Sequence, residues 1–304
     1  MTLSLSRSLL LCSILASVSS VAYADPWSFA ASLSGTGGDY RDSLARDHMW
    51  EAGVRFSGTY LDVGDVAVAD THTYVAMKGG THASSQDASL LSGDWHLQPA
   101  GMQGVLTLRL DAYHIHSNDT NQTIDRVTAF APQLSYLSHD KDWYFDLGYA
   151  HSHYTSDLNV QEWTPTFGFA FNQQYDWMQF RGYRILNLNP TLSSGVSHTS
   201  ALDAKWTHFF GAQSNHFMPT SFTLGALIGK RVYAVDMDSQ TVFNLPDIQE
   251  GGLNVTLAWQ LAKNTKFLLF VGNAQFKAIS TTNTANYTNY YGLNVGYANI
   301  SVTW

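Results

Sequence analysis

The sequence predicts an all-β fold: a transmembrane, antiparallel, up-and-down β-barrel of about 14 strands, within a range of roughly 12 to 16. Strand-length segments that alternate apolar with small or polar residues recur along the chain, separated by turn-like clusters. Charged residues make up only 13% of the chain, yet the mean hydropathy is −0.13. The final stretch, Tyr287–Trp304, also alternates and ends on an aromatic residue. A terminal strand needs a partner, and barrel closure provides one.

The composition suits a barrel better than a soluble domain. Soluble domains usually carry about 25% charged residues. Here polarity comes from Ser, Thr, Asn, Gln and Gly, and 13% of the residues are aromatic. After residue 24 no run of about 18 apolar residues occurs, which excludes helical spans. The net charge of −8 argues against a nucleic-acid partner.

The first 24 residues have the pattern of a secretory signal peptide. Arg7 provides the positive charge, Leu9–Val21 the apolar core, and Ala22-Tyr23-Ala24 the small-residue cleavage site. We therefore expect two parts, a signal peptide at 1–24 and a single transmembrane barrel at 25–304. Cys12, the one cysteine of the chain, lies in the first part without the pattern of a lipid anchor. The mature chain then folds without disulfides.

The expected strands follow in order along the chain. The clearest ones lie around Trp27–Leu33, Trp50–Phe56, Leu106–Ala112, Trp143–Tyr149, Trp163–Phe171, Leu202–Trp206, Phe222–Ile228 and Leu253–Leu261. Weaker candidates are Gly64–Lys78, Ser89–Gln98, Thr128–Leu137, Tyr175–Leu188 and Phe267–Ile279. Pro132 is awkward in a fully paired strand. Tyr175–Leu188 is aromatic on both faces, so its inward face is not assigned.

The connections are expected to alternate between short and long. Ser138–Asp142, Asn172–Tyr175 and Ala262–Lys266 are tight, whereas Gly35–Asp47, Lys78–Ala88, Leu188–His198 and Ala234–Glu250 are longer and polar. None is long enough for a plug domain, so we expect the lumen not to be filled by a folded-in domain, although Ala234–Glu250 could fold partway in. Asp236, Asp238, Asp247 and Glu250 make the longest connection acidic, which is typical of a solvated loop.

The chain's ending resembles the closing strand of Gram-negative outer-membrane β-barrels, which finish on Phe or Trp after alternating apolar residues. Ile300, Val302 and Trp304 carry this resemblance. It implies an outer-membrane location, contact with outer-membrane lipid, and Trp304 as a signal for the barrel-assembly machinery. The upstream run from Tyr291 to Tyr297 has the opposite phase, which requires either a bulge near Ala298-Asn299 or an apolar patch in the lumen.

Charged residues in the inward phase are the candidate lumen lining, because Arg or Lys facing lipid costs about 2–4 kcal/mol at the midplane. They are Glu51, Arg55, Arg109, Asp111, Asp146, Asp203 and Lys205. They could line a solvated channel or form a salt-bridge network that fills a narrow barrel. Because the chain is acidic overall, we expect the channel to favour cations, with Asp111, Asp146 and Asp203 as the main contributors.

Histidine pairs are the main alternative site. His114 with His116, and His151 with His153, each place two imidazoles on one strand face. One pair supplies two ligands where zinc requires three or four. Interfacial histidines are therefore the preferred interpretation, and no metal or cofactor is predicted.

A catalytic site is a further alternative. His114–Asn118 is similar to the His-x-Ser-Asn-Gly signature of outer-membrane phospholipase A, but His116 and Ser117 are adjacent and would point to opposite faces. His82-Ala-Ser84 has the right spacing in a loop without an evident third partner. We therefore predict no catalytic residues.

The preferred function is a porin-like channel that passes small hydrophilic solutes through the lumen. The alternatives are a structural or export component of the envelope, such as an outlet for a surface polymer, and a surface lipase or deacylase.

Overall fold

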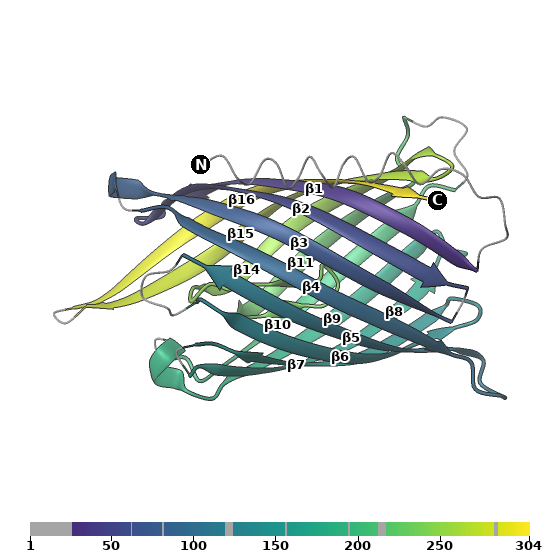
Figure 1. The fold of residues 1–304 in the computed structure, drawn as a ribbon, viewed down its shortest axis with the longest axis horizontal. Helices are drawn as coiled ribbons and strands as arrows, with labels where there is room; N and C mark the ends of the chain where they lie inside the picture. The colour runs from purple at the N-terminus through teal and green to yellow at the C-terminus, as the bar shows by residue number, and fades with distance from the viewer. Residues whose placement is uncertain are drawn as a thin grey trace.

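Fourteen strands form a closed antiparallel barrel (Figure 1). The computed structural model describes residues 26–61, 63–80, 82–118, 124–155, 157–193, 195–211, 217–282 and 285–304. Each barrel strand pairs with its neighbours in chain order, and β1 closes the cycle with β16. The fold class and strand number predicted from the sequence are therefore confirmed. The predicted signal peptide, 1–24, lies outside the described residues.

The barrel strands are β1 Trp27–Arg41, β2 Arg46–Tyr60, β3 Gly64–Met77, β4 Ser84–Leu97, β5 Gly104–Ser117, β6 Val127–Ser138, β7 Trp143–His153, β8 Asn159–Phe171, β9 Asp176–Asn187, β10 His198–Phe209, β11 Ser221–Arg231, β14 Ile248–Ala262, β15 Thr265–Thr282 and β16 Ala285–Thr303. A separate two-stranded hairpin, β12 (Val235–Asp236) with β13 (Thr241–Val242), lies between β11 and β14. Two short 3-10 turns are η1 (Lys78–Gly80) and η2 (Pro190–Ser193).

The seam between the first and last strands is regular. Leu33 pairs with Ile300, and Ala30 pairs with Thr303. At the end of the seam, the backbone N–H groups of Phe29 and Trp304 each donate to the other residue's carbonyl oxygen, at 2.9 Å in both directions. This reciprocal pair leaves the terminal residue fully inside the hydrogen-bonded cycle, as a closed barrel requires in lipid.

No bulge interrupts β16 between its two phases, because its register with β1 and with β15 is unshifted. The structure instead has the apolar patch in the lumen. Tyr291 is buried and packs against Tyr40 and Phe276 inside the barrel, with Leu293 alongside. The change of phase in the sequence therefore marks the point along β16 where the apolar side chains change from the lumen face, around Tyr291, to the outer face, around Ile300.

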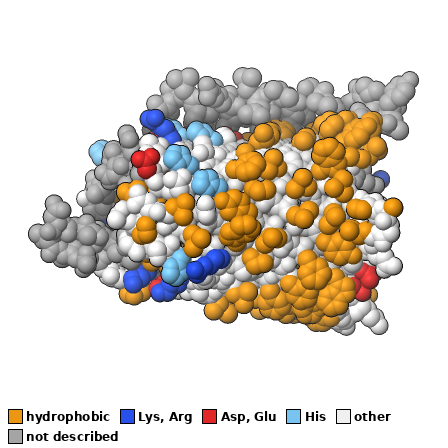
Figure 2. Space-filling view, turned by 90° about the horizontal axis from the view of Figure 1, so that it is seen from below, with side chains coloured by type: hydrophobic (Ala, Val, Ile, Leu, Met, Phe, Trp, Pro, Cys, Tyr) orange, Lys and Arg blue, Asp and Glu red, His pale blue; other side chains and the backbone are white. Residues whose placement is uncertain are grey.

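The outer surface carries an apolar band, as the alternation predicts. Leu33, Val68, Leu91, Leu110 and Leu147 are examples of large apolar side chains exposed on the outside. Figure 2 shows such side chains covering much of one face, with His, Lys and Arg gathered toward one end. Because these side chains have no protein partner, the band is suited to contact lipid tails.

Aromatic side chains border the band near the barrel end where β1 begins and β16 ends. Trp27 lies 5.1 Å from Tyr60 between ring centroids, and Trp259 lies 5.5 Å from Phe267. Trp143 stacks on Phe167 at 5.9 Å. Such girdles mark membrane–water interfaces in barrels of this kind.

Several predicted loops turn out to be strand. Most of Gly35–Asp47 belongs to β1 and β2, which leaves only residues 42–45 as a connection. The longest connection, Val232–Asp247, is not solvated as predicted, because it folds into the barrel. We call residues Val232–Asp247 the lumen loop. Within the described ranges, no helix is both long and apolar enough to cross a membrane.

Candidate functional site

The lumen loop runs from the end of β11 into the barrel and back to the start of β14. Val232, Tyr233, Ala234, Val235 and Met237 are all 2% exposed or less. The β12–β13 hairpin pairs Val235 with Val242, and Phe243 N–H donates to Ala234 O at 2.8 Å. A connection too short to be a domain therefore folds into the lumen, within the stretch Ala234–Glu250.

Apolar packing holds the first half of the lumen loop against the wall. Val232, Tyr233 and Ala234 belong to a cluster with wall residues such as Ile185 of β9, and with Tyr154 of the connection between β7 and β8. Val235 and Met237 form a second cluster with residues of β4 to β7. Burying each large apolar side chain contributes roughly 1.5–3 kcal/mol. The first half of the loop is therefore firmly anchored.

Glu162 of β8 supports the same segment. Its Oε2 accepts a hydrogen bond from Val235 N–H at 2.9 Å, and the side chain is 1% exposed. Its Oε1 is buried without a hydrogen-bond partner. Because a buried backbone N–H needs an acceptor, this contact ties the loop backbone to the wall.

The tip of the loop is a turn held by Asp236. Its Oδ1 accepts from the backbone N–H groups of Asp238 and Ser239, at 3.1 Å each, and its Oδ2 lies 3.4 Å from Arg231 Nη1. Burial raises the pKa of Asp236, but Arg231, Lys205, the backbone N–H of Ser239 and Arg181 together lower it by more, so that the pKa lies below its usual range. The carboxylate is therefore ionised at neutral pH and fixes where Asp238 points.

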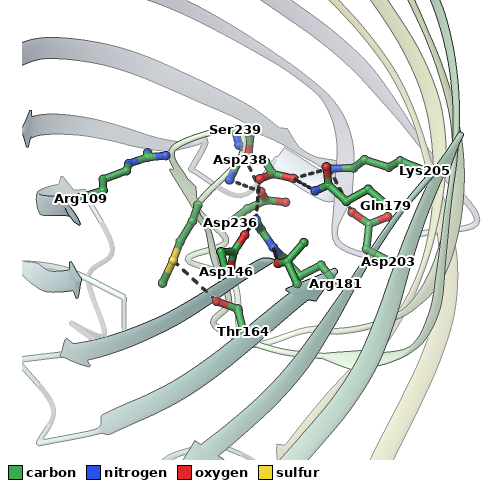
Figure 3. Close-up of polar contacts among 12 residues, drawn as sticks. Arg109, Asp146, Thr164, Gln179, Arg181, Asp203, Lys205, Asp236, Asp238 and Ser239 are labelled. Atoms are coloured by element: carbon green, nitrogen blue, oxygen red, sulfur yellow. Dashed lines mark hydrogen bonds and ion pairs between the residues drawn. The ribbon is translucent and has the colours of Figure 1, made fainter. Parts of the chain in front are cut away.

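Asp238 reaches the wall formed by β9 and β10 (Figure 3). Its Oδ1 lies 2.7 Å from Arg181 Nη1, and its Oδ2 lies 2.7 Å from Lys205 Nζ. Gln179 Nε2 donates to the same Oδ2 at 3.3 Å. One carboxylate is therefore divided between a guanidinium and an ammonium group, and all three of its neighbours are N–H donors.

The opposite wall holds the other side of the tip. Gln240 accepts from Arg55 of β2 and donates to Ser92 of β4 at 3.1 Å and to Asp111 of β5 at 3.4 Å. These partners and those of Asp238 lie on separate groups of strands. The segment from Asp236 to Gln240 therefore bridges the lumen.

The return half of the loop is fastened at its base. Asp247 accepts from Arg46 and, at 2.6 Å, from Tyr291 Oη. Asn244 donates to Gln86 Oε1 at 3.0 Å and to Ile124 O at 2.7 Å. Most contacts of this half are polar, whereas those of the first half are mainly apolar.

The predicted lumen residues all lie in the inward phase of their strands, and most of them are paired. Arg109 makes a two-pronged contact with Asp111 at 2.7 and 3.1 Å. Arg181 lies 2.9 Å from Asp146, and Lys205 lies 3.2 Å from Asp203. Glu51 accepts from Thr36 and Thr73. The three acids expected to favour cations are thus each paired with a base, so their fields largely cancel.

Sequence reasoning missed Arg181, Arg231 and Gln179. Arg181 lies in the stretch whose phase the aromatic pattern hides, and its register opposite Asp203 identifies it as inward. Asp236 and Asp238 were noticed, but their interpretation as part of a solvated loop was wrong. In the sequence, the only signal for these contacts was the number of Arg and Lys residues on the strands that face the loop.

The histidine pairs lie on the outer surface and do not meet. His114 and His116 are on β5 and His151 and His153 on β7, with β6 between them. His116 Nδ1 lies 2.8 Å from Asp125 Oδ1, and His153 Nδ1 lies 3.0 Å from Asn159 Oδ1. In the described part of the chain, no group of three or more His, Cys, Asp or Glu side chains is arranged to hold a metal ion.

The catalytic alternatives are not assembled either. Ser117 is buried, whereas the His116 side chain is 62% exposed, as expected for adjacent residues on opposite strand faces. His82 lies in the connection before β4, and Ser84 begins that strand.

No protein-family model and no curated protein sequence matches the chain. Solved structures share its general architecture at low similarity. Pseudomonas aeruginosa OccK7 (OpdD) is 9% identical with a TM-score of 0.43, covering 91% of this chain and 99% of that one. Acinetobacter baumannii Omp33 is 10% identical with a TM-score of 0.43 and the same coverage. A bacterial polysaccharide outer membrane secretin is 11% identical with a TM-score of 0.47, covering 90% and 98%.

Proposed function

We propose that the protein is a channel of the Gram-negative outer membrane that passes small hydrophilic solutes and is gated by the lumen loop. The observation that carries this proposal is the contrast between the two surfaces of the barrel. The outside presents a continuous apolar band, whereas the inside carries Arg55, Arg109, Lys205 and their acidic partners. A polar interior within an apolar cylinder provides a route for water-soluble molecules.

The strand number supports an aqueous interior. Barrels of about eight strands are filled by their own side chains, whereas those of about 16 hold a water channel. A 14-stranded barrel is wide enough that side chains alone do not fill it, and here a loop occupies part of the interior. The tip is attached mainly through ion pairs and hydrogen bonds, which water can replace when the tip moves.

The proposal includes three further expectations. Residues 1–24 are removed as a signal peptide, Trp304 is read by the barrel-assembly machinery, and the protein is not an enzyme. The separated histidine pairs and the opposed faces of His116 and Ser117 support the last of these.

The test is the conductance of the purified protein in a planar bilayer, with and without a lock on the loop. Gln240→Cys and Ser92→Cys place thiols on side chains that are in contact. Cys12 is replaced by Ser in the precursor so that these are the only thiols. We expect openings in the unmodified protein, fewer openings after a short thiol crosslinker joins the two residues, and recovery when a cleavable crosslinker is reduced.

Folding is checked by gel migration, because a closed barrel shifts its mobility on boiling. Folded protein that stays silent in the bilayer, both unmodified and with residues 236–240 replaced by glycine, would exclude the channel. That result would favour the structural or export function.

A further inference from the structure

The contacts of Asp238 describe a binding site as well as an ion pair. We propose that Arg181, Lys205 and Gln179 form a site for the carboxylate of small hydrophilic anions, and that Asp238 occupies it as a tethered competitor. This inference rests on the proposed channel function and names its solute class. A solute carboxylate and the tip of the loop would then exclude each other from the same place.

The site is held by the wall and not by the loop. Arg181 Nε donates to Thr166 Oγ1 at 2.7 Å, and its Nη2 donates to Asp146 Oδ2 at 2.9 Å. Both partners belong to the barrel wall, Thr166 to β8 and Asp146 to β7, and the Arg181 side chain is 1% exposed. The guanidinium orientation therefore persists when the tip leaves, and Nη1 stays directed into the lumen. Such preorganisation lowers the cost of binding a new carboxylate.

Asp238 fills this site imperfectly. Arg181 Nη1 lies 2.7 Å from Asp238 Oδ1, yet it is a buried nitrogen without a properly directed hydrogen bond. The loop backbone, fixed by Asp236, determines how the Asp238 carboxylate approaches. A free carboxylate has no such constraint and can align with the guanidinium, where a charge-assisted hydrogen bond is strongest.

The chemistry of the site selects a carboxylate. The three side-chain atoms that contact Asp238, namely Arg181 Nη1, Lys205 Nζ and Gln179 Nε2, are all N–H donors. The two oxygens of Asp238 are divided between two cations, an arrangement that one planar carboxylate satisfies with both of its oxygens. Asp146 and Asp203 already balance the charges of Arg181 and Lys205, so a bound carboxylate is held by the direction of their N–H groups and not by a net positive charge.

Competition also provides the gate. A ligand shifts a two-state equilibrium only by its difference in affinity for the two states. The carboxylate site is free only when the tip is out, so a solute that binds there favours the open lumen. The tethered Asp238 acts at an effective concentration on the order of millimolar, which sets the solute concentration at which opening begins.

The experiment compares gluconate with sorbitol, a six-carbon polyol that carries an alcohol in place of the carboxylate. Binding to the detergent-solubilised full-length protein is measured by calorimetry at constant ionic strength in chloride buffer. Asp238→Ala removes the competitor, so gluconate should bind it at least about tenfold more tightly than it binds the native protein. Sorbitol should bind neither.

Two further variants locate the site. Asp238→Ala combined with Lys205→Gln should lose the gain in gluconate affinity. Asp238→Ala combined with Glu51→Gln should keep it, because Glu51 contacts Thr36 and Thr73 and not the tip. If the alanine protein does not show the heat-dependent gel shift of a folded barrel, Asp238→Asn is used in its place to remove the competing carboxylate.

Equal gluconate affinity in the native and Asp238→Ala proteins, or binding that survives Lys205→Gln, would overturn the inference. Because calorimetry requires no current, this failure is distinct from a failure of the channel proposal. A silent bilayer with normal gluconate binding would reject conduction alone, whereas a conducting protein without gluconate binding would reject the carboxylate site alone.

Discussion

Met237 of the lumen loop occupies the space left by the missing side chain of Gly148 on β7. A Cβ added at Gly148 would lie 2.4 Å from Met237 Sδ and 2.4 Å from Thr164 Oγ1. Thr164 itself donates to Met237 Sδ at 3.6 Å. The wall therefore has a recess at the place where the loop inserts the Met237 side chain, so the inward position of the loop is built into the wall.

Gly148→Val should therefore displace the loop without opening the barrel. Valine suits a β-strand, but its methyl groups need the volume that Met237 fills. We expect a higher open probability in bilayers and unchanged heat resistance of the barrel. The control is Gly296→Val, since an added Cβ there meets nothing within 4 Å. A Gly148→Val channel that opens no more often than the Gly296→Val channel would contradict this account.

Glu162 provides a second way to loosen the loop. Glu162→Ala leaves Val235 N–H buried without an acceptor, which costs about 1–3 kcal/mol and corresponds to a roughly 5- to 150-fold rise in the released population. Glu162→Gln keeps an oxygen that can accept the bond and should have a much smaller effect.

The measurement for Glu162 is the reactivity of a thiol placed at Ala234, which is 0% exposed, with a membrane-impermeant maleimide. Labelling should be fastest in the Glu162→Ala background and slow in the native and Glu162→Gln backgrounds. Equal labelling rates in the two Glu162 variants would mean that the contact with Val235 does not hold the loop.

The barrel was predictable from sequence because its determinants are local and repeated. Leu108 and Leu110 face out while Arg109 and Asp111 face in. Each strand of this kind shows the same alternation between lipid-facing and lumen-facing residues. The lumen loop was not predictable in this way. Its position depends on the recess at Gly148, on Arg181 and on Glu162, which come from three different strands and meet only after the barrel closes.

The same reasoning explains why the sequence identified the lumen charges but left their pairing open. Inward phase is a property of one strand and can be read from alternation. Pairing depends on the neighbouring strands, as with Asp146, whose partner Arg181 lies on β9 with β8 between them. Summing acids along the sequence therefore cannot give the field in the lumen, which depends on these pairs.

Reciprocal substitutions at Arg109 and Asp111 should move ion selectivity in opposite directions. Asp111→Asn leaves a net positive charge at this pair and should shift the reversal potential toward anions. Arg109→Gln should shift it toward cations. Both are measured across a salt gradient, and Glu51→Gln reports the effect of a single lumen acid that no base contacts within 4 Å in the described chain. Reversal-potential shifts of the same sign in Arg109→Gln and Asp111→Asn would show that the two charges do not act on permeating ions through one electric field.

Trp304 should matter for assembly more than its exposure suggests. Its backbone completes the seam with Phe29, so its side chain, 43% exposed, lies at the barrel end where β1 begins and β16 ends. Trp304→Asp places a charge where an indole is favoured at the membrane interface, and it removes the aromatic ending that resembles an assembly signal. We expect strongly reduced surface levels for Trp304→Asp and near-normal levels for Trp304→Phe.

Leu188→Asp, in an exposed connection between β9 and β10, provides the matched charge control and should assemble well. Normal surface levels of the Trp304→Asp protein would show that neither the aromatic ending nor its interfacial position guides assembly.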